Sequence, residues 1–347
     1  KMHHTQLFQL LSSLDEKEFQ QFGDYVRSPF CNKSKKCVRL LSIIEKEYPD
    51  LQSFKLKKEI VFVQIFGKKK YDTSLRNLMS QLKKLVEEFL IFLEFQEEKQ
   101  YQQHLLLQAL RKRRQNSHFQ RKIKQIKSKY EQEKIKSIDF FYADYLITKD
   151  AYIFDIGDLK AKKRTDVLDL LRSFDTFTIL NKLKYCCILA SNKGIEAVRK
   201  DVFLFENLLN EISNFEFEKN ASIKIYVCVL QMLLHENETL FLEKLKKILK
   251  NESHVLEQAD LLNIYQITVN FCIRKWNKGE IKYVIDLWIL YEQMLEKGLL
   301  HSNRILIHQS FKNLIIIGLR LQKFDKVKLY IEQYKGCLLY TSPSPRD

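Results

Sequence analysis

Cysteine and histidine are the side chains of this sequence best suited to metal binding or nucleophilic chemistry. His301 and His308 lie seven residues apart, but no acidic or cysteine ligand stands between them. Cys186 and Cys187 are adjacent, so on a helix they point about 100° apart and cannot jointly hold one metal ion. No CxxC pair is present. We therefore predict buried or surface roles for these residues, with reduced thiols and no metal site.

The glycines are spaced too widely for the common phosphate-binding and nucleophile motifs. All eight lie at least eighteen residues apart. GxGxxG, Walker and GxSxG motifs need glycines within a few residues of one another, because the backbone must approach a phosphate or turn sharply there. The sequence therefore predicts no cofactor and no catalytic site, and we interpret the protein as a non-enzyme.

Positive charge is the remaining chemical feature. The formal net charge is +16, and the segment from Arg111 to Lys136 carries eleven Lys and Arg against two Glu, a net charge of +9. Clustered cations bind phosphates by releasing condensed counterions. One hypothesis is therefore a nucleic-acid-binding helix, and its candidate contacts are Arg111, Lys112, Arg113, Arg114, Arg121 and Lys122.

The alternative interpretation of this segment is a solvated helix. Phe119, Ile123, Ile126 and Tyr130 recur at spacings of three and four, so they would anchor one side while the cations point outward. We favour this alternative, because charge alone informs on solubility and loose association rather than on a specific partner. Cations on one continuous exposed face would favour nucleic acid, whereas cations spread around the helix would favour solubility.

The elements that must position these residues are helices. Between Asp50 and Gly336 the sequence has no proline and only seven glycines, where average usage would give roughly fourteen prolines and twenty glycines. Proline breaks helix interiors by removing a donor, and glycine costs backbone entropy there. We therefore predict an all-α fold, in which tightly joined helices follow one another.

Residues 1–100 are predicted to form a helical N-terminal domain. Ser13 and Glu16 fit a capping box that opens a helix toward Arg27, and Gly67 suits the end of a later helix. A long helix follows, whose apolar residues alternate at spacings of three and four: Leu75, Leu78, Leu82, Leu85, Phe89 and Phe92. This run covers under three heptads, which favours packing within one chain over a dimer. A winged-helix-like DNA-binding module is the alternative, although no strand pair is evident.

A basic helical connector is predicted over residues 101–174, and helical repeats with a period of about 43 over residues 175–336. When the chain is laid over itself, the joint between the two helices of each unit falls at Gly194, Asn237, Gly279 and Lys323. The aligned positions of the second helices are all apolar: Val198/Phe241/Val284/Val327, Val202/Leu245/Trp288/Ile331 and Phe205/Ile248/Tyr291/Tyr334. Each pair would bury its apolar face only against its neighbours, which predicts an α-solenoid.

Several segments resemble known families. Leu314–Ile315 with Lys323–Val327 is similar to tetratricopeptide-like repeats in architecture, but not in motif or unit length. Leu290–Gly298 resembles the end of a pentatricopeptide repeat, a family that reads single-stranded RNA, but the phrase occurs once. Most of the chain resembles an uncharacterised all-helical family from Bacteroidetes-type bacteria. The segments that carry this resemblance are Phe30–Lys36, Leu75–Leu82, Asn270–Lys275 and Gly318–Phe324. That resemblance implies no established activity.

Tetratricopeptide geometry would place the first helices of the units along a concave binding surface. By this analogy the candidate partner-binding residues are Gln266, Val269, Ile273, Trp276, Lys312, Ile316 and Arg320. We therefore expect a non-catalytic protein-interaction or scaffold protein that binds another protein, with nucleic-acid binding as the alternative.

The ends of the sequence suggest a fragment. Residues 337–347 resemble the translation of a transposase sequencing adapter, so we interpret them as non-native and expect the repeats to be truncated. Leu329 and Tyr330 should then be more exposed than their counterparts in the preceding unit. Apolar runs are too short to span a bilayer. With reduced cysteines and no leader, the expected location is cytoplasmic.

Overall fold

The computed structural model describes residues 4–67, 73–157, 165–212, 220–302, 305–306 and 308–334. Its regular elements are helices, apart from a two-residue antiparallel pairing of β1 (His301–Ser302) with β2 (Ile305–Leu306). The chain divides into two compact units, residues 1–103 and 104–347. The all-α prediction is confirmed. No helix among the described residues is long and apolar enough to cross a membrane.

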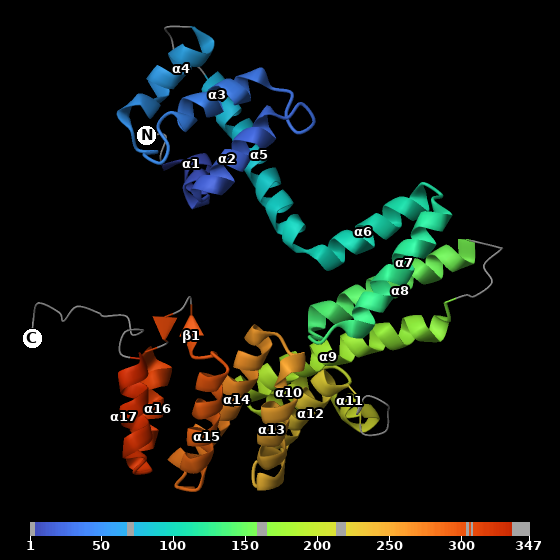
Figure 1. Cartoon of the computed structure of the whole chain (residues 1–347), viewed down its shortest axis with the longest axis vertical. Helices are drawn as coiled ribbons and strands as arrows, with labels where there is room; N and C mark the ends of the chain where they lie inside the picture. Colours follow the sequence, from blue (N-terminus) through green and yellow to red (C-terminus); the bar gives the residue numbers. More distant parts are fainter. Residues whose placement is uncertain are drawn as a thin grey trace, which may run out of the picture. The chain divides into compact units, whose positions relative to one another are not determined.

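The N-terminal unit has its own apolar core, and Figure 1 shows the helices that surround it. Its elements are α1 (Gln6–Ser13), α2 (Glu16–Arg27), α3 (Lys35–Glu45), the 3-10 turn η2 (Phe54–Leu56), α4 (Lys58–Phe66) and α5 (Ser74–Glu97). The leucine-rich face of α5 packs against α1, α2 and α3, and buries Leu75, Leu78, Leu82, Leu85 and Phe89. Phe92 is 42% exposed at the edge of this contact, where its ring lies 6.2 Å from that of Tyr25 in α2. The stripe therefore packs within the chain, as predicted.

The capping box of α2 lies two residues later than the sequence predicts. The Asp15 carboxylate accepts from the Glu18 N–H at 2.7 Å, and the Glu18 carboxylate accepts from the Asp15 N–H at 2.9 Å. Ser13 instead closes α1, where its hydroxyl donates to the Leu10 carbonyl. Asp15 accepts better than a serine because its charge also favours the helix N-terminus. The predicted ends at Arg27 and at Gly67, which has a left-handed φ of 66°, are confirmed.

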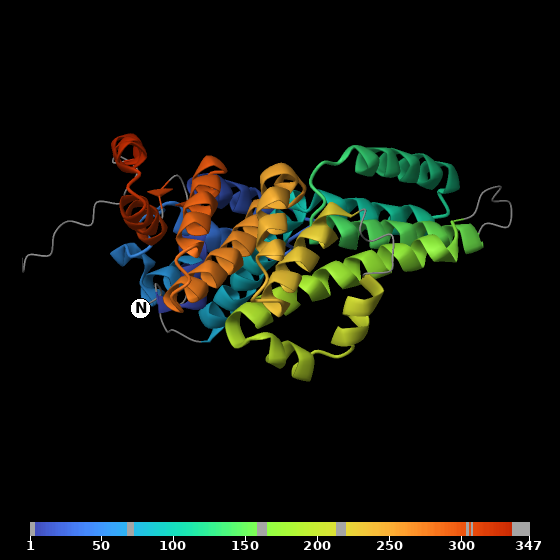
Figure 2. The same ribbon diagram turned by 90° about the horizontal axis from the view of Figure 1, so that it is seen from below.

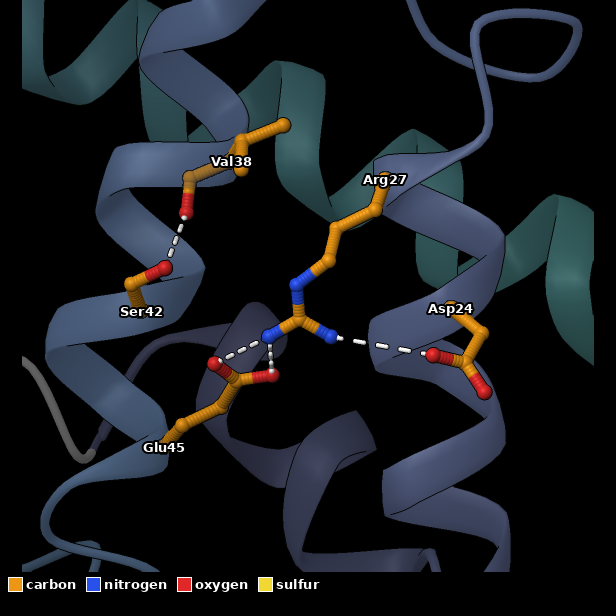
Figure 3. Close-up of polar contacts among 5 residues, drawn as sticks. All are labelled: Asp24, Arg27, Val38, Ser42 and Glu45. Carbon is orange, nitrogen blue, oxygen red and sulfur yellow. Dashed lines mark hydrogen bonds and ion pairs between the residues drawn. The ribbon is translucent and has the colours of Figure 1, made fainter.

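An ion pair joins α2 to α3. Figure 3 shows the Arg27 guanidinium between Asp24 of its own helix and Glu45 of α3. One of its nitrogens donates to both carboxylate oxygens of Glu45. Gly23 leaves room for this pair, since a Cβ there would stand 2.7 Å from the guanidinium. Surface pairs of this kind add about 0–1 kcal/mol, so the apolar core carries the stability of this unit.

The winged-helix expectation finds no support in the N-terminal unit. A wing requires paired strands. Among residues 4–67 and 73–103 the structure contains helices and turns, and no strand.

The C-terminal unit begins with a small helical cluster. It is formed by α6 (Lys99–Lys112) from His104 onward, α7 (Asn116–Gln132) and α8 (Ile138–Gly157). Leu107, Phe119, Ile126, Ile147 and Phe154 meet in its centre, where the rings of Phe119 and Phe154 stack at 4.1 Å. Helix α8 packs along the long helix α9 (Val167–Lys193), so this cluster is continuous with the helix pairs that follow.

Helix pairs follow in order through the rest of this unit (Figures 1 and 2). Helix α9 is followed by the short α10 (Ile195–Asp201) and α11 (Phe205–Ile212), and α12 (Ala221–Leu234) by α13 (Thr239–Asn251) and the turn η4 (Ser253–Val255). Next come α14 (Gln258–Asn277) with α15 (Tyr283–Glu296), and α16 (His308–Arg320) with α17 (Phe324–Tyr334). Gly194, Asn237, Gly279 and Lys323 each lie in the turn between two helices. The helices α9, α12 and α14 contact one another, and one apolar core runs from Ile138 to Val327.

The aligned apolar positions differ in burial along this series. Leu245 and Trp288 are at most 4% exposed, whereas Ile331, at the same position of α17, is 45% exposed. Leu329 is exposed and Tyr330 is partly buried, and both are more exposed than their counterparts Asp286 and Leu287, as expected from the sequence. Residues 337–347, which are predicted to be non-native, lie outside the described residues.

Gly318 allows the last pair to pack closely. A Cβ at this position of α16 would lie 2.5 Å from Val327 Cγ2 and 2.6 Å from Trp288 Cζ3. Both neighbours are buried and belong to the two helices that enclose α16, namely α15 and α17. The absence of a side chain at Gly318 therefore sets the distance between these helices.

We expect Gly318→Ala to destabilise the protein by about 1–3 kcal/mol, because the rigid indole of Trp288 must shift to admit the methyl group. Urea unfolding followed by circular dichroism measures this loss. Gly157→Ala is the matched control, since a Cβ there meets nothing within 4 Å. Equal stability of the two variants would contradict the close approach.

Candidate interaction surface

Trp276 and Arg320 meet on the surface of the C-terminal unit. Trp276 lies in the last turn of α14, with its ring packed against the core, and Arg320 is the exposed last residue of α16. The guanidinium carbon of Arg320 stands 4.8 Å from the centroid of the Trp276 ring. A cation at this distance is attracted by the negative face of the indole. The contact thus joins the first helices of two successive pairs.

Most of the other predicted partner-binding residues also reach solvent. Gln266 and Lys312 are exposed, Ile316 is 47% exposed, and Ile273 is partly buried. The prediction for Val269 is corrected, because this side chain is 5% exposed and belongs to the core. Helix α14 contacts α9, α12 and α15, so its buried arc is wider than the tetratricopeptide analogy allows.

Leu319 is a member of this surface that the sequence analysis does not predict. It is 47% exposed and follows Ile316 by three residues on α16. Residues three apart are neighbours on a helix surface, so this spacing is the signal that would have found it. We call the set formed by Ile273, Trp276, Ile316, Leu319 and Arg320 the Trp276 surface.

The Trp276 surface combines apolar contact area with one cation. Tryptophan and arginine are the residues most enriched among binding hot spots, because each offers a large face and a polar group. The surface holds no nucleophile or general base. Its chemistry is therefore that of non-covalent contact.

Potential metal ligands and three buried thiols can be assessed in the described part of the chain. No group of three or more potential His, Cys, Asp or Glu ligands occurs among the described residues. Burial raises the pKa of the Cys37 and Cys272 thiols and that of Cys228 to about 11, which keeps them protonated and unreactive at neutral pH. The side chains of His301 and His308 lie outside the described residues.

No protein-family model, curated protein or solved structure matches this chain. The resemblance to an all-helical bacterial family therefore stays a prediction.

The exposed cations of the basic segment are spread around α7. Lys112, Arg113, Arg114 and Arg121 are exposed, and none pairs with a carboxylate in the part of the chain that the structure describes. Lys122 is partly buried. On α7 the buried residues are Phe119 and Ile126, and the exposed Lys127 and Lys129 fall on opposite flanks of that stripe at about 100° per residue. This spread favours a solvated helix.

Arg111 has a structural contact within the chain, which sets it apart from the other predicted nucleic-acid contacts. Its guanidinium lies 3.6 Å from a carboxylate oxygen of Asp150, whose side chain is 3% exposed. The other oxygen of Asp150 meets His104 Nδ1 at 2.7 Å, and the remaining ring nitrogen of His104 meets the Gln108 amide at 3.0 Å. Burial raises the pKa of Asp150, although His104 and Arg111 act to lower it. Arg111 therefore offsets the cost of a buried carboxylate between α6 and α8.

We expect Arg111→Gln to lower stability by about 1–2 kcal/mol at neutral pH, because it leaves the buried Asp150 carboxylate less compensated. The loss should shrink as the pH falls. Asp150 has a folded pKa above its unfolded value, so its ionisation costs stability as the pH rises through that range, and Arg111 offsets the cost only while the carboxylate is charged.

Urea unfolding of the wild type and the variant measures the effect, at neutral pH and at a series of lower pH values toward the ordinary carboxyl pKa of 3.8. Lys112→Gln is the control, since Lys112 is exposed one residue further along. A stability loss independent of pH, or one shared by Lys112→Gln, would contradict this role for Arg111.

Proposed function

We propose that the protein is a non-catalytic interaction or scaffold protein, whose helices α9 to α17 form a tetratricopeptide-like α-solenoid with a unit of about 43 residues. The observation that supports this proposal best is the contact between Trp276 and Arg320 at 4.8 Å. It places an aromatic and a cationic hot-spot residue on the first helices of successive pairs, where a solenoid binds its partners.

Polar contacts between helices of different pairs support a rigid binding platform. Lys184 of α9 lies 2.6 Å from Asp260 of α14, and Lys326 of α17 lies 2.7 Å from Glu292 of α15. The buried Lys246 of α13 binds Asp286 of α15. A platform held in this way loses little conformational entropy on binding, which favours affinity.

The chemistry of the Trp276 surface indicates a partner segment with apolar and acidic side chains. Ile316 and Leu319 offer exposed apolar area beside the Trp276 ring. Arg320 and the exposed Lys312 are the charged residues of α16 on this side. A carboxylate of the partner would pair with Arg320 in the forked geometry that guanidinium groups favour.

Nucleic-acid binding is the second proposal, and one observation favours it. Lys112, Arg113 and Arg114 are consecutive exposed cations with no carboxylate partner among the described residues, and Arg121 follows on α7. Such cations remain available to phosphates. The spread of charge around α7 places this proposal behind protein binding.

The test uses the full chain as bait in an extract of the cells that encode it, with and without nuclease. We expect a protein partner that survives nuclease. Trp276→Ala and Arg320→Glu should each weaken its binding about tenfold or more, because both remove a central contact.

Leu240→Ala is the control, since Leu240 is 66% exposed at the start of α13 and outside the Trp276 surface. Binding that is insensitive to the Trp276 and Arg320 variants would overturn the assignment of this surface. Loss of the partner on nuclease treatment, with sensitivity to Lys112→Gln and Arg113→Gln, would establish the second proposal instead.

A further inference from the structure

The second helix of the first pair is shorter than its counterparts. Helix α10 has 7 residues, whereas α13 has 13, α15 has 14 and α17 has 11. The break falls at residues 202–204, where Leu204 has a left-handed φ of 58°. A non-glycine residue rarely adopts this conformation, and it redirects the chain. The following helix α11 therefore does not continue the line of α10 (Figure 2).

A groove runs along the C-terminal half of α9 and reaches the break at Val202. Its volume is about 630 Å³, and its lining is mostly apolar. Phe177, Tyr185, Ile188 and Leu189 of α9 contribute, together with Val202 at the break. Tyr185 is 61% exposed, and Phe203 in the break is 79% exposed. Contiguous exposed apolar surface of this kind marks an interaction site.

The charges of the groove are all positive. Lys182 and Lys193 line it, and no Asp or Glu is among its lining residues. The Lys182 ammonium donates to the Phe203 carbonyl at the edge of the groove. Lys193 is exposed at the last turn of α9. An occupant with carboxylates beside its apolar face would complement both lysines.

We propose that this α9 groove binds an acidic amphipathic helix of a partner protein, which lies along α9 and covers the apolar surface that the short α10 leaves open. The other pairs show the same kind of packing within the chain, since α13 buries Leu242, Leu245 and Leu249. In contrast, α10 buries only Val198 among its residues. Helix-in-groove recognition reads apolar anchors at spacings of three and four, here against Tyr185 and Leu189. This site is separate from the Trp276 surface.

The experiment measures fluorescence anisotropy with two labelled helical peptides. Both carry leucines along one face, and their flanking positions are glutamate in one peptide and lysine in the other. We expect saturable binding of the glutamate peptide to the full chain, at least about tenfold tighter than the lysine peptide. Tyr185→Ala should weaken it about tenfold or more, because it removes an aromatic anchor.

A charge swap tests the polarity of the groove. Lys193→Glu should weaken binding of the glutamate peptide and strengthen binding of the lysine peptide. Lys200→Glu is the control, since Lys200 is exposed on α10, and it should change the affinity for neither peptide. The Trp276→Ala variant should bind both peptides with wild-type affinity, which separates this site from the Trp276 surface. No saturable binding, equal binding of the two peptides, or insensitivity to both Tyr185→Ala and Lys193→Glu would overturn the proposal.

Discussion

An amphipathic helix pair cannot bury its apolar faces alone, and the fold from α9 onward depends on this constraint. The core that results is continuous, since Leu180 of α9, Val229 of α12, Tyr265 of α14 and Leu287 of α15 are all fully buried within it. Trp288 shows how tight the contact between pairs becomes, because it packs where Gly318 has no side chain. Each pair is thereby positioned by its neighbours, and its outer surfaces remain available for binding.

Buried lysines also join helices of neighbouring pairs. Lys246 is 9% exposed and Lys275 is 4% exposed, and such cations are tolerated only when they are paired. Burial acts to lower the pKa of Lys246, but the carboxylates of Asp286 and Glu243 raise it overall. Lys275 lies near Glu236 of the preceding joint and Glu280 of its own. These contacts make the relative placement of neighbouring pairs specific, whereas apolar burial alone would permit sliding.

The sequence predicts helix content and helix joints better than it predicts surfaces. Depletion of proline and glycine indicates the all-α fold, and Gly67 marks a helix end because a left-handed residue is needed there. The break at Leu204 carries no such signal, since a leucine stands where glycine is usual. The burial of Val269 and the pairing of Arg111 with Asp150 depend on neighbours distant in sequence. Periodicity within one helix does not reveal such neighbours.

Native-state hydrogen exchange tests the central claim, that each helix pair is stabilised by its neighbours, most directly. In such a stack, pairs with neighbours on both sides open at a higher free energy than a pair with an uncovered face. Helix α17 exposes Leu329 and Ile331, whereas Val229 of α12 and Ile264 of α14 are fully buried. We predict that the amides of α16 and α17 exchange well before those of α12 and α14. Exchange of all these helices at one common free energy would contradict the account.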